Sequence, residues 1–481
     1  MPLTPSPASE PVELLPVALP AGLPAPVSAE RIEAVARQLR ASGGPGSGGA
    51  PELVGPGSEL ENLSHDFFTY SPVLTPLLSG HHAQLVVKAT ALGHVQQVAA
   101  ACAQQQVPLT VRGAGTGNYG QCVPLAGGVV LDLSGLRQLR RFDPASGVLT
   151  AEAGCLLGDL DRQLAAHGRA LRLTPSTSRS ATLGGFIAGG SGGIGSLRWG
   201  FLRDPGNLLG LEIVTVEPEP RLLQLDASGS RPLNHAYGTN GILTAVSVPT
   251  AAAETWQQLV VDFSSWDAAI EAARLLPCTA LVLQELCLLE APAARQLPLP
   301  GGCPAARGHR LLLLAAPQAL PVLMPLLDQL GGALVWQAAE GDSRGLPLRE
   351  LTWNHTTLHL RAHDKGWTYL QMLLPQPEAP ALAALKQRWG DDLLWHLEGV
   401  RQQGQQRLAA IPLVRWRDRA ALQALMEQAR DLGALIFNPH ILTVEDGGLG
   451  VIDADQVAAK IAYDPAGLLN PGKLRGWACR G

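Results

Sequence analysis

A run of small residues constrains this chain more than any other feature of its sequence. Eight glycines fall between residues 184 and 200. Glycine costs about 1 kcal/mol relative to alanine in an ordinary helix, so this density needs a physical reason. A flexible loop is one interpretation, but Leu183, Phe186 and Ile187 are poor residues for such a loop. We favour the close approach of the backbone to a flat, bulky cofactor.

A second glycine-rich segment follows a predicted strand at residues 107–111. Its residues Gly115, Gly117 and Gly120 match the GxGxxG spacing of dinucleotide-binding proteins. That fingerprint has to open a helix whose N-terminus meets the pyrophosphate. Here the glycines are followed by a proline, a glycine pair and another predicted strand at residues 129–133. This context disfavours a Rossmann site for NAD.

The same loop is suited to binding an anion without a helix. Successive glycines allow several backbone N–H groups to point into one concavity. Arg112 stands at the end of the strand, where its charge would help to neutralise a pyrophosphate. Thr116 and Asn118 add side-chain donors. The alternative is a surface loop made of residues that favour turns.

Two further segments complete a recognisable order of motifs. Residues 237–244 read Tyr-Gly-Thr-Asn-Gly-Ile-Leu-Thr, and residues 463–473 read Tyr-Asp-Pro-Ala-Gly-Leu-Leu-Asn-Pro-Gly-Lys. They accompany Arg-Gly-x-Gly-Thr-Gly at residues 112–117 and Thr-Leu-Gly-Gly-x-Ile-Ala-Gly-Gly-Ser-Gly-Gly at residues 182–193. With these four motifs in order, the chain resembles the vanillyl-alcohol oxidase / p-cresol methylhydroxylase family. Its motifs are most similar to those of the FAD-linked oxidases that include glycolate oxidase and D-lactate dehydrogenase.

The resemblance implies an α+β fold with a defined division of the chain. Residues 56–250 would form a p-cresol methylhydroxylase-type FAD-binding domain with two subdomains. Residues 251–459, which resemble the family only loosely, would form an α+β substrate or cap domain. Residues 460–481 would return to the FAD-binding domain. Residues 1–55 are predicted to be a disordered tail with one helix at residues 28–42, because the first residues are dense in proline and alanine.

The resemblance also assigns the residues that would bind FAD. The pyrophosphate loop would comprise Arg112, Gly113, Ala114, Gly115, Thr116, Gly117 and Asn118. Further contacts along the cofactor would come from Pro175, Ser176, Thr182, Gly185, Gly189, Ser191, Gly241, Ile242, Thr244, Asn470 and Lys473. Some family members attach FAD covalently to a histidine in or near the first loop, but residues 113–127 contain none. Cys122 is the other nucleophile there, and we interpret it as a buried structural residue. We therefore expect non-covalent FAD.

The second domain should supply a base. Proteins of this family oxidise a C–H bond next to a hydroxyl or amine, and the protein removes a proton while the flavin accepts the hydride. Histidine has a suitable pKa, which makes His355, His396 and His440 the catalytic candidates. His355 and His359 would share one face of a helix or one side of a strand. His396 and Glu398 alternate, so on a strand both would face the same side.

Metal ligands and a substrate clamp are less well defined. Related dehydrogenases hold a divalent metal with a His-Gly-Asp-Gly-Asn-x-His run, which this sequence lacks. We predict no metal, although His396, Glu398 and His440 leave a facial ligand set open. An acidic substrate would require an arginine clamp, for which Arg361, Arg401 and Arg415 are equal candidates.

Composition excludes several classes of partner. The formal net charge is −5 and no basic block occurs, which disfavours nucleic acid. The longest apolar run, residues 311–327, contains three prolines and is too short to cross a bilayer. No signal-peptide pattern is seen. The seven cysteines form no CxxC pair, which is typical of reduced cytosolic thiols. We expect a cytoplasmic protein without an integral membrane segment.

Together these features predict an FAD-dependent oxidase or dehydrogenase acting on CH–OH donors. The substrate would be a small hydroxy acid or another alcohol-type polar molecule, and the electrons would pass to an unknown acceptor. One alternative is an accessory flavin-binding subunit of a larger redox complex. Another is a flavin reductase that uses NADPH, which shares the FAD-binding fold.

Overall fold

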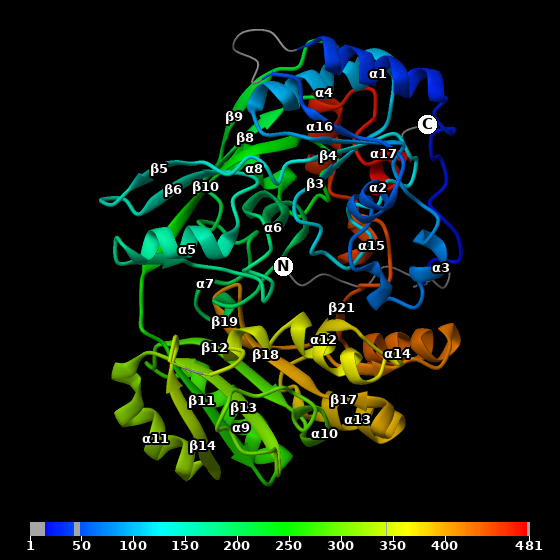
Figure 1. Cartoon of the computed structure of the whole chain (residues 1–481). Coiled ribbons are helices and arrows are strands. Elements are labelled where there is room, and N and C mark those ends of the chain that lie inside the picture. Colours follow the sequence, from blue (N-terminus) through cyan, green and yellow to red (C-terminus); the bar gives the residue numbers. More distant parts are fainter. Residues whose placement is uncertain (1–14, 43–48, 343, 479–481) are drawn as a thin grey trace.

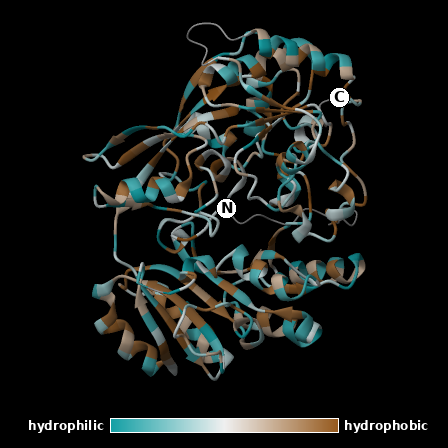
Figure 2. Ribbon diagram, in the orientation of Figure 1, coloured by the Kyte–Doolittle hydropathy of each residue, from teal (hydrophilic) through white to brown (hydrophobic). Residues whose placement is uncertain are grey.

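The computed structural model describes residues 15–42, 49–342 and 344–478. The chain folds into two parts that lie one above the other in Figure 1. The first part contains the elements up to β10 together with the C-terminal helices, and the second contains the elements from β11 to β21. Hydrophobic residues gather in the sheets, and hydrophilic residues predominate on outer helices such as α1 (Ala29–Ala41) and α5 (Leu157–Ala165) (Figure 2). The predicted α+β architecture is confirmed.

The first part is built on two sheets. A four-stranded sheet has the order β1-β2-β4-β3, in which β2 and β3 both pair with β4 in parallel. Helix α4 (Leu92–Gln105) packs on it because Val95, Val98, Ala99 and Cys102 fall on one face and are fully buried. The strands are β1 (Glu52–Val54), β2 (Leu85–Lys88), β3 (Leu109–Arg112) and β4 (Val129–Asp132). Short helices α2 (Ser58–Leu63) and α3 (Thr75–Leu78) connect the first two strands.

The second sheet of this part is antiparallel, with the order β5-β6-β10-β8-β9 and β7 paired to the end of β10. Its strands are β5 (Leu139–Asp143), β6 (Val148–Glu152), β7 (Arg169–Leu171), β8 (Gly210–Val214), β9 (Leu222–Asp226) and β10 (Ile242–Ala252). Helices α5 and α6 (Leu183–Gly189) pack against it through a shared apolar core. Helices α7 (Ser196–Trp199) and α8 (Ala227–Ser230) are single turns. The predicted glycine-rich segment thus lies partly in a helix, with Phe186 and Ile187 buried.

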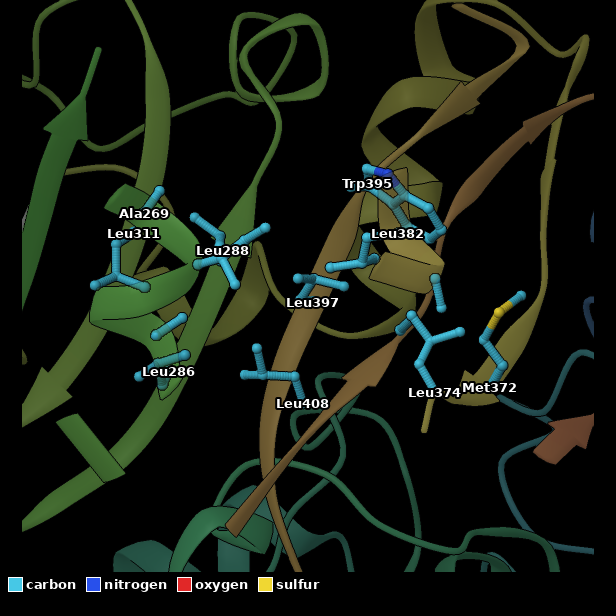
Figure 3. Close-up of a cluster of buried hydrophobic side chains, with 14 of the residues drawn as sticks. Ala269, Leu286, Leu288, Leu311, Met372, Leu374, Leu382, Trp395, Leu397 and Leu408 are labelled. Atoms are coloured by element: carbon cyan, nitrogen blue, oxygen red, sulfur yellow. The ribbon is translucent and has the colours of Figure 1, made fainter. Parts of the chain in front are cut away.

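The second part is an eight-stranded sheet with helices packed on it. Its order is β14-β11-β13-β12-β18-β19-β16-β21. The strands are β11 (Gln257–Phe263), β12 (Leu283–Leu289), β13 (His309–Ala315), β14 (Gly332–Ala339), β16 (Gln371–Leu373), β18 (His396–Gln402), β19 (Gln405–Ala410) and β21 (Leu435–Phe437). The packed helices are α9 (Trp266–Leu275), α11 (Leu320–Gln329), α13 (Ala379–Trp389) and α14 (Arg419–Asp431). Leu286, Leu288, Leu397 and Leu408 form the centre of this core (Figure 3).

Helix α12 (Asn354–His363) lies between the eight-stranded sheet and the first part of the molecule (Figure 1). It follows a turn at Trp353, whose φ of 53° lies in the left-handed region. A small sheet with the order β15-β20-β17 stands beside it. Its strands are β15 (Trp367–Tyr369), β17 (Leu393–Leu394) and β20 (Leu413–Arg415). The remaining short helix of this part is α10 (Ala291–Ala294).

Both ends of the described chain join elements that are distant in sequence. The backbone N–H of Leu109 donates to the carbonyl of Leu468, so the C-terminal segment extends the first sheet. That segment contains α15 (Val444–Gly447), α16 (Ala454–Tyr463) and α17 (Arg475–Ala478). At the other end, Leu15 is buried in the core of the second part, and Arg419 donates to its carbonyl. Among the helices of the described residues, none is both long and apolar enough to cross a membrane.

Candidate cofactor and substrate site

The loop after β3, residues 113–121, forms the floor of a cavity of about 100 Å³. We call these residues the glycine loop and this space the loop cavity. Opposite the loop lie the first turn of α6 and the segment before β10. Within the described part of the chain, the backbone N–H groups of residues 114–118 donate no hydrogen bond. These unused donors beside a cavity are what binding of a pyrophosphate requires.

Glycine is required on both walls of the loop cavity. A Cβ atom on Gly113 would lie 2.2 Å from the Oγ1 of Thr182. A Cβ on Gly117 would lie 2.2 Å from the amide oxygen of Gln121, and one on Gly189 would lie 3.1 Å from the same side chain. The walls therefore approach each other too closely for larger residues, as expected where the backbone holds a ligand. This cradle suits the diphosphate group of FAD.

Charged and polar side chains support the glycine loop from behind. The guanidinium of Arg112 donates to the carbonyls of His65 and Ala114, and its Nη1 is 3.7 Å from the Sγ of Cys122. Lys473 donates to the carbonyl of Gly120. The Nδ2 of Asn470 donates to the carbonyls of Gln121 (2.8 Å) and Tyr237 (2.7 Å), and so ties the two walls together.

Two buried charges lie beneath the loop. Burial raises the pKa of Asp66 to about 6, although the nearby Lys473 opposes this shift. Burial also lowers the pKa of Lys473 to about 8, against the attraction of Asp66. The carboxyl oxygen Oδ2 of Asp66 has no hydrogen-bond partner among the described residues. Because Asp66 and Lys473 lie together, the two side chains are either both neutral or form an ion pair. No isolated charge is then buried beneath the loop, which stabilises it.

Most of the residues predicted to bind FAD line the loop cavity or the space next to it. They are Gly113, Ala114, Gly115, Thr116, Gly117, Asn118, Pro175, Ser176, Thr182, Gly185, Gly189, Ser191 and Gly241. Five others lie behind the walls and line neither space: Arg112, Ile242, Thr244, Asn470 and Lys473. Ile242 belongs to the apolar core, and Thr244 donates to the carboxylate of Glu212. The structure therefore brings thirteen of the predicted residues to the two cavities and leaves these five outside the linings.

A second cavity, of about 300 Å³, adjoins the first and shares Thr116, Gly117, Gln121, Gly185 and Gly189 with it. We call it the aromatic cavity. The first part of the molecule contributes the glycine-rich wall and residues of the loop. The second part contributes the start of α12 and one residue of β16. Its substrate-side lining is Phe67, Tyr70, Tyr119, Trp353, Asn354, His355, Leu358 and Gln371.

His355 is the one catalytic candidate that reaches the aromatic cavity. Its Nδ1 lies 3.2 Å from the carbonyl oxygen of Glu350. A carbonyl only accepts, so Nδ1 carries the proton and Nε2 keeps its lone pair. Burial lowers the pKa of His355 to about 4, so the imidazole is neutral at pH 7. His359 donates to the same carbonyl at 3.0 Å but does not line the cavity.

Beside His355, a group of polar side chains converges on Tyr119. The Nε2 of Gln371 donates to the hydroxyl of Tyr119 at 2.8 Å. Asn354 and Tyr369 also approach this hydroxyl, which burial keeps protonated by raising the pKa of Tyr119. The carbonyl oxygen Oδ1 of Asn354 has no partner among the described residues. The wall therefore offers neutral donors and acceptors to a substrate.

The structure places His396 and His440, the other two catalytic candidates, away from the aromatic cavity. His440 is fully buried between the hydroxyl of Ser71 (2.8 Å) and the carbonyl of Tyr369 (2.9 Å). His396 is fully buried on β18, where its Nε2 lies 2.6 Å from Glu398. The prediction that His396 and Glu398 face one side of a strand is correct. Neither histidine lines the aromatic cavity, and both are enclosed by protein.

A buried acidic pair sits directly beneath Trp353. Glu398 accepts from the backbone N–H of Trp353 at 2.7 Å, and Glu285 accepts from its indole Nε1 at 3.0 Å. Burial raises the pKa of Glu398 to about 8 and that of Glu285 as well, so the pair carries at most part of a charge. Holding both nitrogens of Trp353 fixes the left-handed turn that starts α12 and aims His355 at the cavity.

The facial metal set considered from the sequence does not form, because His440 lies with Ser71 and Tyr369. Cys287 from β12 instead joins His396 and Glu398, with ligand atoms within 4.8 Å of one another. The contact of 2.6 Å between His396 and Glu398 is a direct hydrogen bond. As the side chains stand, His396 and Glu398 are hydrogen-bonded to each other and Cys287 lies beside them.

The three arginines proposed as a substrate clamp are engaged elsewhere. Arg361 donates to the carbonyls of Thr69, Lys365 and Trp367 and stacks over the ring of Tyr70. Arg415 pairs with Asp364, and Arg401 donates to the carbonyl of Arg198. None of the three lines the aromatic cavity.

Several lining residues were missed by the sequence reasoning. Phe67 and Tyr70 form an aromatic cluster ahead of the first motif, a signal that residues 65–70 display in the sequence. Trp353 and Asn354 are neighbours of His355, so the same local motif contains them. Gln371 lies on a short strand with no distinguishing pattern, and only the fold brings it to Tyr119.

Comparisons with known proteins identify the first part of the chain. A family of FAD binding domains matches residues 83–220. A probable mitochondrial D-2-hydroxyglutarate dehydrogenase from Oryza sativa subsp. indica is 30% identical over 178 residues, which cover 35% of this chain and 31% of that protein. The chain thus aligns with about a third of that relative. A glycolate oxidase subunit from Bacillus subtilis is 25% identical over 79% of this chain and 86% of its own.

The similarity to known flavoproteins extends, at the level of the fold, over nearly the whole chain. A solved structure of p-cresol methylhydroxylase with substrate bound has a TM-score of 0.66 at 16% identity, and the match covers 95% of this chain and 98% of that one. The resemblance expected from the four motifs is confirmed. The chain therefore carries an FAD-binding domain at residues 83–220 and has the fold of the p-cresol methylhydroxylase-type flavoproteins.

Proposed function

We propose that this protein is an FAD-dependent oxidoreductase that oxidises the CH–OH group of a small polar substrate. FAD, when bound, supplies the acceptor for a hydride and so for two electrons. The hydroxyl proton of the substrate passes to the Nε2 of His355. Loss of the hydride and the proton converts the alcohol to a carbonyl product, which balances the reaction.

The position and protonation of His355 carry this proposal. It stands on the wall of the aromatic cavity that faces the glycine-rich wall of the FAD-binding domain. Its Nδ1 donates to Glu350, which leaves Nε2 free to accept a proton. The relatives support the reaction type, because their names describe dehydrogenases and oxidases of 2-hydroxy acids. The family match covers residues 83–220, and His355 lies outside that range.

Anaerobic mixing of the FAD-loaded protein with a panel of alcohols and hydroxy acids tests the proposal. We expect at least one compound to bleach the flavin near 450 nm. The rate constant should be nearly constant from pH 8 to pH 5. It should fall about tenfold per pH unit below about 4, because protonation removes the lone pair of His355, whose pKa is lowered to about 4.

Reduction by NADPH alone, with no response to any alcohol, would contradict this function and favour a flavin reductase. A flavin that accepts electrons only from a partner protein would favour an accessory subunit. An inverse pH profile, with faster reduction as pH falls through 4, would exclude His355 as the base.

We also propose that FAD is held without a covalent bond. Within the described lining of the loop cavity, Cys122 is the only nucleophilic thiol or imidazole. Burial raises its pKa to about 12, so it stays a thiol, which is a weak nucleophile. Acid or heat precipitation of the purified yellow protein should release intact FAD into the supernatant. Yellow colour that stays with the precipitated polypeptide would show a covalent bond.

A further inference from the structure

The charge of the aromatic cavity bears on which alcohol it accepts. Among the described residues that line it, none is lysine, arginine, aspartate or glutamate. Its titratable side chains are Tyr70, Tyr119 and His355. Burial raises the pKa of both tyrosines and lowers that of His355, so all three are neutral at pH 7.

Two arginines that contact residues around the cavity already have partners. Arg361 uses its donors on three backbone carbonyls and lies 5.2 Å from the centre of the Tyr70 ring, and it does not line the cavity. Arg179 forms an ion pair with Glu350, and 71% of its side chain is exposed. A carboxylate that entered the aromatic cavity would lose its hydration without gaining a cation, which is strongly unfavourable.

The polar atoms of the wall also favour a neutral alcohol over a carboxylate. The Nε2 of His355 has a lone pair and needs a proton from the ligand. A hydroxyl group supplies one, whereas a carboxylate has only acceptors and would face this lone pair with repulsion. The other polar side chains of this wall, Asn354 and Gln371, are uncharged amides, which suit a second hydroxyl group.

We propose that the aromatic cavity selects a neutral alcohol with a second hydroxyl group, a vicinal diol or larger polyol, over the hydroxy acid of the same size. This inference rests on the proposed oxidoreductase function and names its substrate class. One hydroxyl gives its proton to His355, and the other bonds to the uncharged amide side chains of the same wall. The rings of Tyr70 and Trp353 cover the carbon chain.

Matched pairs of compounds test the inference on the FAD-loaded protein. In 1,2-propanediol and lactate, and again in glycerol and glycerate, a CH₂OH group replaces a carboxylate on the same skeleton. We expect the diol of each pair to reduce the flavin with a second-order rate constant at least about tenfold above that of the acid. The diol should also perturb the oxidised flavin spectrum at lower concentration than the acid does.

Faster reduction by lactate and glycerate would overturn the neutral-substrate inference and leave the oxidoreductase function standing. No reduction by either member of any pair, in a protein whose flavin dithionite still reduces, would overturn both. The two failures are therefore distinguishable.

A charge introduced at the rim provides the matched variant. Leu358 lines the cavity and is 37% exposed, so a longer side chain there does not have to be buried. In Leu358→Arg, the ratio of the lactate rate to the 1,2-propanediol rate should rise by about tenfold or more. In Leu358→Gln, which is polar but uncharged, the ratio should move less than about threefold. An unchanged ratio in Leu358→Arg would mean that charge does not set the preference, and would overturn the inference.

Discussion

In His355→Ala, the anaerobic reduction of the flavin should slow by about 10²–10⁴-fold, the usual contribution of a positioned general base. The loss should be chemical, because the imidazole stands on a cavity wall and is only partly buried. The backbone carbonyl of Glu350, which accepts from His355 in the wild type, still accepts a hydrogen bond from His359 in the variant. FAD content and melting temperature should therefore stay close to those of the wild type.

His359→Ala is the matched control for this experiment. It removes the other histidine that donates to Glu350, one helical turn away, but leaves the cavity lining intact. Its reduction rate should stay within about threefold of the wild type. If His355→Ala loses stability by about 1–3 kcal/mol while its folded fraction reacts at the normal rate, the residue is structural and the proposed base is wrong.

In Gly115→Val, the protein should be purified with less than about a tenth of the wild-type flavin. Gly115 has a φ of +67°, and a Cβ there would lie 2.2 Å from the guanidinium of Arg112. The left-handed backbone costs a branched residue roughly 1–2 kcal/mol. The contact with Arg112 then displaces either the guanidinium or the glycine loop that it supports. Flavin absorbance per polypeptide after gel filtration measures the result.

Gly168→Val separates backbone strain from the loss of the cradle. Gly168 has a φ of +66° and nothing within 4 Å of its added Cβ, and it lies outside both cavities. This variant should lose a similar part of its stability through strain, yet keep its flavin. Wild-type flavin occupancy in Gly115→Val would show that the glycine loop does not hold the cofactor.

The sequence predicted well what depends on local spacing. The glycines of the glycine loop follow a strand and precede another, and the structure has β3 and β4 at those places. The alternation of His396 and Glu398 predicted a shared side of a strand, and the two side chains meet at 2.6 Å. Such patterns extend over a few residues, so the chain's own geometry determines them.

What the sequence could not predict is which side of an element faces a cavity. His355, His396 and His440 carry the same chemical signal, yet only tertiary packing decides that the first lines the cavity and the others are buried. Tertiary packing also sets the orientation of the Arg112 side chain, because the guanidinium donates to the carbonyls of His65 and Ala114. Gln371 meets Tyr119 across 252 positions of sequence, a contact that no local pattern encodes.

The support of the glycine loop has a consequence for biosynthesis. Asn470 and Lys473 hold Gln121 and Gly120 from positions 349 and 353 residues later in the sequence. A ribosome has therefore translated the whole second part before these supports of the loop exist. The early strands can pair while synthesis continues, since domains fold as their residues emerge. Firm capture of the nucleotide has to wait until residues 470–473 have emerged and folded back, so loading with flavin follows the synthesis of the second part.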